Sequence, residues 1–218
     1  MNLKGVIFDL DGTLADTLPI CIHAHRRSFE EFLGRTYSDR EIVAMFGPSE
    51  EGIVATHISP DQREACLECF LDEYDKAHAS CTAPFPGITE ALDRLRSRGV
   101  RLAIVTGKGA HSAKISLRHL GIEKYFDAVE TGAPEGGIKP RCIARILQEW
   151  RMPPEEAAYV GDALADVASS REAGVLPLAA AWAATASADA LETLHPAALF
   201  RTVPDFLSWI DEVTAHRS

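Results

Sequence analysis

The stretch GVIFDLDGTLADT, residues 5–17, decides how the rest of the chain is interpreted. Its apolar beginning is typical of a strand that is buried on both faces of a parallel sheet. The run stops at Asp9, and a second carboxylate, Asp11, follows two residues later. Asp-Gly is also common turn chemistry, so a strand followed by a plain turn is the alternative. A calcium loop is disfavoured, because it needs Gly at its sixth position and Leu14 stands there.

Further apolar runs follow along the chain, and amphipathic segments separate them. The helical segments cover residues 87–99, 110–121 and 140–150. Strands that alternate with helices predict an α/β fold with a Rossmann-like, doubly wound parallel sheet. The expected strands after the first one cover residues 101–107, 126–132, 157–162 and 175–182.

One long segment breaks this alternation with helical periodicity and no convincing strand. A first helix is expected to end at Gly34, and Ser38 with Glu41 has the spacing of a capping box. A longer helix is expected to begin near Ser59 or Asp61. We therefore expect an all-helical cap domain inserted into the α/β core. The core would comprise residues 1–15 and 84–218, and the cap residues 16–83.

The composition limits the possible functions of the chain. Its 218 residues are 46% hydrophobic, which is enough to bury a core. The formal net charge of -10 excludes the dense basic surface that nucleic-acid binding needs. Five scattered cysteines favour reduced thiols, and no signal segment or membrane-spanning stretch is visible. We expect a cytoplasmic protein without a membrane or nucleic-acid partner.

Polar side chains stand where the predicted strands end. The carboxyl ends of parallel strands face one crevice, so these side chains should converge there. Taken singly, each has a plainer interpretation: a strand end, a solvated lysine, or a helix N-cap with an exposed acid in the first turn. The converging residues are Asp9, Asp11, Thr106, Gly107, Lys139, Asp162 and Asp166.

A cluster of carboxylates is costly unless a cation neutralises it, and carboxylate and carbonyl oxygens suit Mg²⁺. The metal, Lys139 and Thr106 would then form a pocket for a dianion such as phosphate. One carboxylate in that pocket can attack phosphorus, and a second can protonate the leaving oxygen and later activate water. The Asp-x-Asp spacing fits this division of labour.

Four short motifs resemble those of the haloacid dehalogenase superfamily, in its phosphatase branch. Their order and spacing match across nearly the whole chain, including a helical cap inserted after the first motif. They are DLDGTLADT (9–17), VTG (105–107), IKP (138–140) and GDALAD (161–166).

The resemblance implies a role for each matching residue. Asp9 would be the nucleophile and Asp11 the general acid and base. Thr106 and Lys139 would hold the transferring phosphoryl group, with Gly107 beside them. Mg²⁺ would be bound by Asp9, by the backbone carbonyl of Asp11 and by Asp162, with Asp166 in support.

The resemblance is nearest to phosphoglycolate phosphatase-like enzymes. It implies a Mg²⁺-dependent phosphatase that acts on a small phosphorylated metabolite through an aspartyl-phosphate. The alternatives are a pyrophosphatase or sugar-phosphate mutase of the same fold, or a non-catalytic protein that binds a phosphate ligand. The sequence indicates no oligomeric state.

Some features depart from the family pattern or lie outside it. Gly107 stands where Asn or Ser is usual, and TGAPEGGIKP (131–140) is unusually rich in glycine. Lys108 lies beside the phosphate-binding residue, and exposure to solvent is its plainer interpretation. The run HAHRR (23–27) could reach substrate from the cap, but a solvated helix face is favoured. The segment FGPSEEG (46–52) resembles cap loops that contact substrate.

Overall fold

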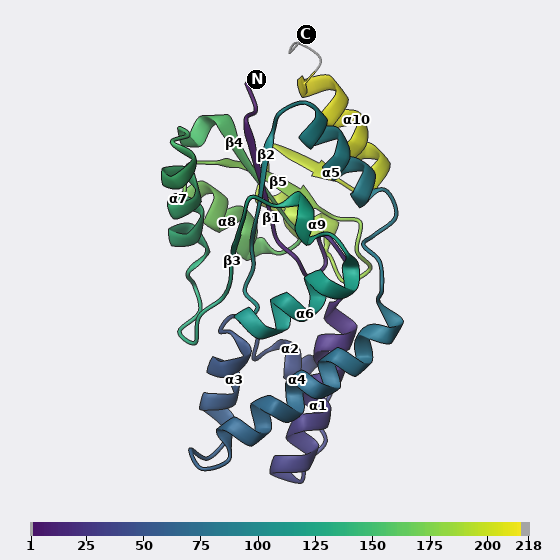
Figure 1. Cartoon of the computed structure of the whole chain (residues 1–218), viewed down its shortest axis with the longest axis vertical. Coiled ribbons are helices and arrows are strands. Elements are labelled where there is room, and N and C mark those ends of the chain that lie inside the picture. The colour runs from purple at the N-terminus through teal and green to yellow at the C-terminus, as the bar shows by residue number, and fades with distance from the viewer. Residues whose placement is uncertain (1, 215–218) are drawn as a thin grey trace.

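A parallel six-stranded sheet forms the centre of the protein in a computed structural model, which describes residues 2–214 (Figure 1). The strand order is β3-β2-β1-β4-β5-β6, and every pairing is parallel. This is a doubly wound order, in which the direction of winding reverses between β1 and β4. The strands are β1 (Gly5–Phe8), β2 (Arg101–Val105), β3 (Ala128–Glu130), β4 (Ala157–Gly161), β5 (Leu176–Ala180) and β6 (Ala198–Phe200).

Helices cover both faces of this sheet. In Figure 1, α5 and α10 lie together on one face, while α7 and α8 lie on the other. No helix within residues 2–214 is long and apolar enough to cross a membrane. The helices around the sheet are α5 (Ile88–Ser97), α6 (Ala110–Leu120), α7 (Lys139–Trp150), α8 (Leu164–Glu172), α9 (Ala188–Thr193) and α10 (Val203–Thr214), with short 3₁₀ turns at Glu123–Tyr125 and Pro154–Glu156.

Alternating side chains of β1 divide between two apolar clusters. Val6 and Phe8 point to the face covered by α5 and α10, and the Phe8 ring meets the Phe206 ring edge-on at 6.2 Å. Ile7 points to the opposite face, where it packs with Ile143 of α7. Both faces of this central strand are therefore buried, which explains why its sequence is an unbroken apolar run.

A helical layer, defined as α1 to α4, is inserted between β1 and α5. It lies beyond the ends of β1 and β2 in Figure 1, and α1 and α4 pack along each other. Its two apolar clusters are separate from those of the sheet. Its elements are α1 (Leu18–Leu33), α2 (Asp39–Val43), α3 (Glu50–His57), α4 (Arg63–Ala77) and a 3₁₀ turn at His78–Ser80.

The α/β class and its doubly wound parallel sheet are confirmed. Gly34 ends α1 in the left-handed conformation, and Ser38 and Glu41 form the expected reciprocal capping box. The expected start of the long helix was wrong, because α4 begins at Arg63. Residues 59–62 form a turn instead, in which the Gln62 N–H donates to the Ser59 carbonyl at 3.0 Å.

His25 corrects the expectation that residues 23–27 form a solvated helix face. Its side chain is buried in the helical layer, and its ring lies 4.3 Å from that of Phe70. Neither ring nitrogen has a hydrogen-bond partner in the described chain. Burial, with smaller contributions from Lys108 and His57, lowers the pKa of His25 to about 3.

This burial predicts a pH-dependent stability. In the unfolded chain the pKa of His25 is near 6.5, so between pH 6.5 and 3 the unfolded state binds a proton that the folded state rejects. The stabilisation is complete above pH 6.5 and is lost as the pH falls towards 3. From pH 7 to pH 5 the wild type should lose about 2 kcal/mol more unfolding free energy than His25→Leu.

Urea unfolding at pH 7, 6 and 5 measures this difference. His23→Leu is the matched control, because His23 lies on the same helix with a half-exposed side chain. Equal pH slopes for the wild type and His25→Leu would contradict the assignment.

Candidate active site

The candidate site lies where the winding of the sheet reverses. Asp9 directly follows β1, and Asp162 directly follows the neighbouring strand β4. The backbone N–H of Asp9 donates to Val160 of β4 at 2.9 Å, which fixes the two strand ends side by side. Thr106 follows β2 on the other side of β1. The convergence expected from the strand ends is therefore present.

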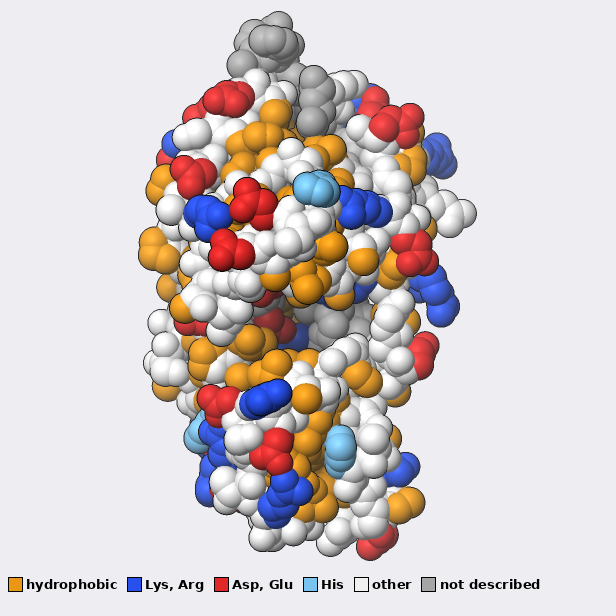
Figure 2. Space-filling view, turned by 180° about the vertical axis from the view of Figure 1, so that it is seen from behind, with side chains coloured by type: hydrophobic (Ala, Val, Ile, Leu, Met, Phe, Trp, Pro, Cys, Tyr) orange, Lys and Arg blue, Asp and Glu red, His pale blue; other side chains and the backbone are white. Residues whose placement is uncertain are grey.

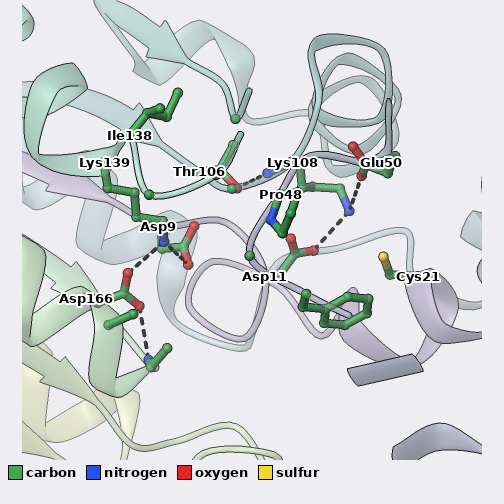
Figure 3. A pocket seen from close by; sticks show the side chains of 18 of the residues that line it. Asp9, Asp11, Cys21, Pro48, Glu50, Thr106, Lys108, Ile138, Lys139 and Asp166 are labelled. Carbon is green, nitrogen blue, oxygen red and sulfur yellow. Dashed lines mark hydrogen bonds and ion pairs between the residues drawn. The ribbon is translucent and has the colours of Figure 1, made fainter. Parts of the chain in front are cut away.

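Lys139, the first residue of α7, joins two of the carboxylates. Its ammonium donates to Asp9 Oδ2 at 2.9 Å and to Asp166 Oδ1 at 2.6 Å (Figure 3). Burial opposes its charge, but the carboxylates of Asp166 and Asp9 raise the pKa of Lys139 well above its ordinary value. Lys139 therefore carries a fixed positive charge at this point.

Asp166 is a buried anchor in the first turn of α8. One carboxylate oxygen accepts from Lys139 and from the Tyr159 hydroxyl, and the other accepts from the Ala163 N–H at 3.0 Å. Ala163 is the N-cap of α8, so the alternative that Asp162 caps this helix is wrong. The same alternative expected Asp166 to be an exposed acid in the first turn of the helix. This is also wrong, because Asp166 is only 1% exposed.

Three carboxylates form a group that could hold a metal ion. Asp9, Asp162 and Asp166 each offer an oxygen, and these oxygens lie within 4.8 Å of one another. Burial, opposed by Lys139, raises the pKa of Asp9 to about 6; burial with Asp9 and Asp166 raises that of Asp162 to about 8. A divalent cation fits this group, because it would keep both carboxylates ionised at neutral pH.

Gly12 permits the close packing of this group. Its φ is +72°, and a Cβ atom there would lie 2.3 Å from a carboxylate oxygen of Asp162. The next residue, Thr13, donates from its hydroxyl to Asp162 at 3.2 Å. A glycine at this position lets the turn after β1 lie against the carboxylate that follows β4.

Asp11 lies on the side of Asp9 that faces the helical layer (Figure 3). It accepts a hydrogen bond from the Thr17 hydroxyl, and the Lys108 ammonium is 3.4 Å away. Thr106 is buried, and its hydroxyl accepts from the Lys108 N–H at 3.3 Å. A Cβ at Gly107 would meet nothing within 4 Å, so the absence of Asn or Ser there leaves open space.

The plainer interpretation of Lys108, exposure to solvent, is wrong. Lys108 is 4% exposed, and its ammonium lies 3.7 Å from Glu50 of α3 as well as beside Asp11. Sequence reasoning missed both residues, although Lys108 directly follows the VTG motif and Glu50 belongs to the 46–52 loop. The pair links the α/β core to the helical layer.

The glycine-rich segment 131–140 meets the 46–52 loop through backbone atoms. The Ser49 N–H donates to the Ala133 carbonyl at 3.0 Å. A Cβ at Gly52 would lie 2.2 Å from the carbonyl oxygen of Pro134, so only glycine permits this approach. Within residues 131–140, a Cβ at Gly136 would lie 2.9 Å from the Gly47 carbonyl oxygen, so this glycine serves the same contact, whereas Gly137 has nothing within 4 Å.

A cavity of about 500 Å³ lies between the core and the helical layer. Figure 2 shows the surface hollowed between these two parts of the molecule. All seven residues expected to converge line the cavity: Asp9, Asp11, Thr106, Gly107, Lys139, Asp162 and Asp166. The helical layer contributes further lining residues, which are Leu18, Cys21, His25, Phe46, Gly47, Pro48, Glu50 and Ile53.

An open α/β sheet with carboxylates, a threonine and a lysine at its switch point can support phosphoryl transfer, and comparison with known proteins identifies the family. The sequence profile of haloacid dehalogenase-like hydrolases matches residues 6–180. The chain therefore belongs to this family, and relatives that are named as phosphatases confirm its resemblance to the phosphatase branch.

Individual relatives match over most of their length. Pyrophosphatase PpaX of Oceanobacillus iheyensis is 27% identical over 97% of this chain and 99% of that protein. The phosphoglycolate phosphatase of Aquifex aeolicus is 29% identical over 83% and 85%, respectively. The structure of a haloacid dehalogenase-like hydrolase from Streptococcus pneumoniae has a TM-score of 0.77 at 30% identity and covers 95% and 98% of the two chains.

The buried Lys108 predicts a measurable stability effect. Lys108→Met removes the cation beside Glu50 and Asp11 and should reduce the free energy of unfolding by roughly 3 kcal/mol. Adding Glu50→Gln should recover part of this loss, because one of the unpaired charges is then absent. Urea unfolding measures both effects.

Lys114→Met is the control, since Lys114 is an exposed lysine on α6. If Lys108→Met unfolds with the same free energy as Lys114→Met, the pairing contributes nothing.

Proposed function

We propose that the protein is a Mg²⁺-dependent phosphatase that hydrolyses a small phosphorylated metabolite through an aspartyl-phosphate. The observation that carries this proposal is the placement of Asp9. Its carboxylate is bound by Lys139, adjoins Asp162, and has Asp11 two residues further along. A dianion in the cavity would meet a nucleophile, positive charge and a proton donor within one pocket.

In the first half of the reaction, a carboxylate oxygen of Asp9 forms a bond to phosphorus. The bond between phosphorus and the ester oxygen breaks, and Asp11 gives its proton to that departing oxygen. Thr106 and Lys139 hold the phosphoryl oxygens, with the open space at Gly107 beside them. In the second half, Asp11 takes a proton from water as that water attacks phosphorus, and phosphate leaves Asp9.

The metal would be held by Asp9, the Asp11 backbone carbonyl and Asp162. Mg²⁺ bound there would supply positive charge to the phosphoryl oxygens. Both oxygens of Asp166 already accept hydrogen bonds from Lys139, Tyr159 and Ala163, which supports an indirect role for it. Asp166 would position Lys139 and the loop that carries Asp162.

Residues 16–83 would act as a cap domain over the core, which comprises residues 1–15 and 84–218. The cap would exclude water during formation of the aspartyl-phosphate and open for product release. A cavity of about 500 Å³ favours a small substrate over a macromolecule. A cytoplasmic location and the absence of nucleic-acid and membrane partners remain predictions.

Asp9→Asn tests the nucleophile. The wild type should hydrolyse p-nitrophenyl phosphate in the presence of Mg²⁺, and the variant should lose activity by a factor on the order of 10³ or more. Asp16→Asn is the matched control, because Asp16 is an exposed carboxylate outside the cavity. An Asp9→Asn variant with wild-type turnover would refute the assignment, and intact folding is checked by circular dichroism.

Metal dependence is tested separately. EDTA should abolish hydrolysis and added Mg²⁺ should restore it. Asp162→Asn should raise the Mg²⁺ concentration for half-maximal activity at least roughly tenfold, because one of the proposed ligands loses its charge. Asp189→Asn, an exposed acid, should leave that concentration unchanged. Full activity in EDTA, or identical Mg²⁺ curves for Asp162→Asn and wild type, would contradict the metal site.

A further inference from the structure

The site divides into two charged arms on either side of Asp9 (Figure 3). On one side, Lys139 joins Asp9 to Asp166. On the other side, Lys108 lies between Asp11 and Glu50 of the helical layer. In the proposed reaction Asp11 protonates the departing oxygen, so the leaving group must lie along this second arm.

Glu50 fills the position in this arm where an anion would otherwise be bound. Its carboxylate accepts from the Gly109 N–H and from the Ser112 hydroxyl, at the start of the eleven-residue helix α6. Backbone N–H groups at a helix N-terminus attract anions. A Cβ at Gly109 would lie 2.6 Å from a Glu51 oxygen and 2.7 Å from a Glu50 oxygen, so the glycine lets both carboxylates approach. A carboxylate of the chain itself therefore occupies this end of α6.

Lys108 is the only described cation in contact with this arm, and two carboxylates share it. Its ammonium lies 3.4 Å from Asp11 and 3.7 Å from Glu50, and 4.3 Å from the centre of the Tyr74 ring. It is buried and has no hydrogen-bond acceptor among the described residues. The ammonium retains hydrogen atoms that could be donated to a ligand, but when Asp11 holds the proton that it gives to the leaving oxygen, the Glu50 carboxylate already balances the charge of Lys108.

The remaining wall offers no compensation for a further negative charge. Among the described residues that line the cavity, fixed positive charge comes from Lys108 and Lys139 alone. Lys139 is committed to Asp9 and Asp166, and His25 is held neutral by burial. The side chains that complete the wall from the helical layer are largely apolar, namely Leu18, Cys21, Phe46 and Ile53.

We propose that Glu50 is a specificity-determining residue that excludes substrates with a second anionic group. This inference rests on the proposed phosphatase function and names its substrate class: phosphate monoesters of neutral alcohols. A carboxylate or second phosphate on the leaving group would place a further anion beside Glu50, with the Lys108 ammonium as the one cation for both. A neutral hydroxyl or carbonyl oxygen instead accepts a hydrogen bond from Lys108 without this repulsion.

Two substrates of matched size test the inference. 2-Hydroxyethyl phosphate and 2-phosphoglycolate differ by a neutral hydroxymethyl against a carboxylate. The wild type should have a kcat/KM at least roughly tenfold higher for 2-hydroxyethyl phosphate. Glu50→Gln should reduce this preference roughly tenfold, because Gln fills the same space without the charge. Where a compound is not turned over, its inhibition constant against p-nitrophenyl phosphate replaces kcat/KM.

Glu64→Gln is the control, because it removes the same charge from an exposed position of the helical layer, in the first turn of α4, that does not line the cavity. It should leave the preference unchanged. A wild type that hydrolyses 2-phosphoglycolate as well as the neutral ester overturns the inference, even if Glu50→Gln fails to fold. A Glu50→Gln variant that alters both substrates equally also overturns it, since Glu50 then acts only structurally.

p-Nitrophenyl phosphate separates this inference from the function on which it rests. Mg²⁺-dependent hydrolysis that Asp9→Asn abolishes supports the phosphatase whichever alcohol is preferred. If the enzyme hydrolyses p-nitrophenyl phosphate but prefers 2-phosphoglycolate to 2-hydroxyethyl phosphate, the proposed role of Glu50 fails and the phosphatase function stands. If p-nitrophenyl phosphate is not hydrolysed at all, the proposed function fails, and the substrate class fails with it.

Discussion

The placement of one ammonium group between two buried carboxylates is the constraint on which the rest of the site depends. Lys139 lies between Asp9 and Asp166. Lys139 begins α7, Asp9 directly follows β1, and Asp166 lies in the first turn of α8. Buried like charges this close are unfavourable unless a cation joins them. The ends of β1 and β4 can therefore lie side by side because α7 begins at a lysine. In the same arrangement no described lysine is bonded to Asp162, and burial with the nearby carboxylates raises its pKa. A divalent metal ion bound there would stabilise the ionised carboxylate.

Much of the fold and half of the site follow from a short chain of inferences. Apolar runs identify buried parallel strands, and the residue after each run lies at the common crevice. This suffices to bring Asp9, Thr106 and Asp162 together without knowledge of any contact. The method fails where an element is too short to leave a pattern. Strand β6 has three residues at the sheet edge and directly follows a loop with Pro196, so its sequence contains no recognisable period.

The other half of the site depends on how the inserted helices lie against the sheet, which local sequence does not determine. Lys108 and Glu50 are 58 positions apart and meet only because α3 approaches the start of α6. Either residue alone has the polarity of a surface position. His25 is comparable, because three of its four neighbours in HAHRR are polar while its own ring faces Phe70 of α4. Helical periodicity indicates which residues share a face, and packing between helices decides whether that face is buried.

The backbone contact between residues 46–52 and 131–138 has a consequence for how the enzyme can change over evolutionary time. The Ser49 N–H and Ala133 carbonyl join these segments through main-chain atoms, and glycines provide the close approach. A contact made by backbone atoms requires glycine where the two segments approach closely. It does not depend on which side chains the intervening residues carry. Pro48, which lines the cavity, can therefore be exchanged while the backbone contact between the two segments is kept, whereas Phe46 is held by its packing against both apolar clusters of the helical layer. Substitutions of this kind can change the shape of the cavity while the backbone contact between residues 46–52 and 131–138 stays the same.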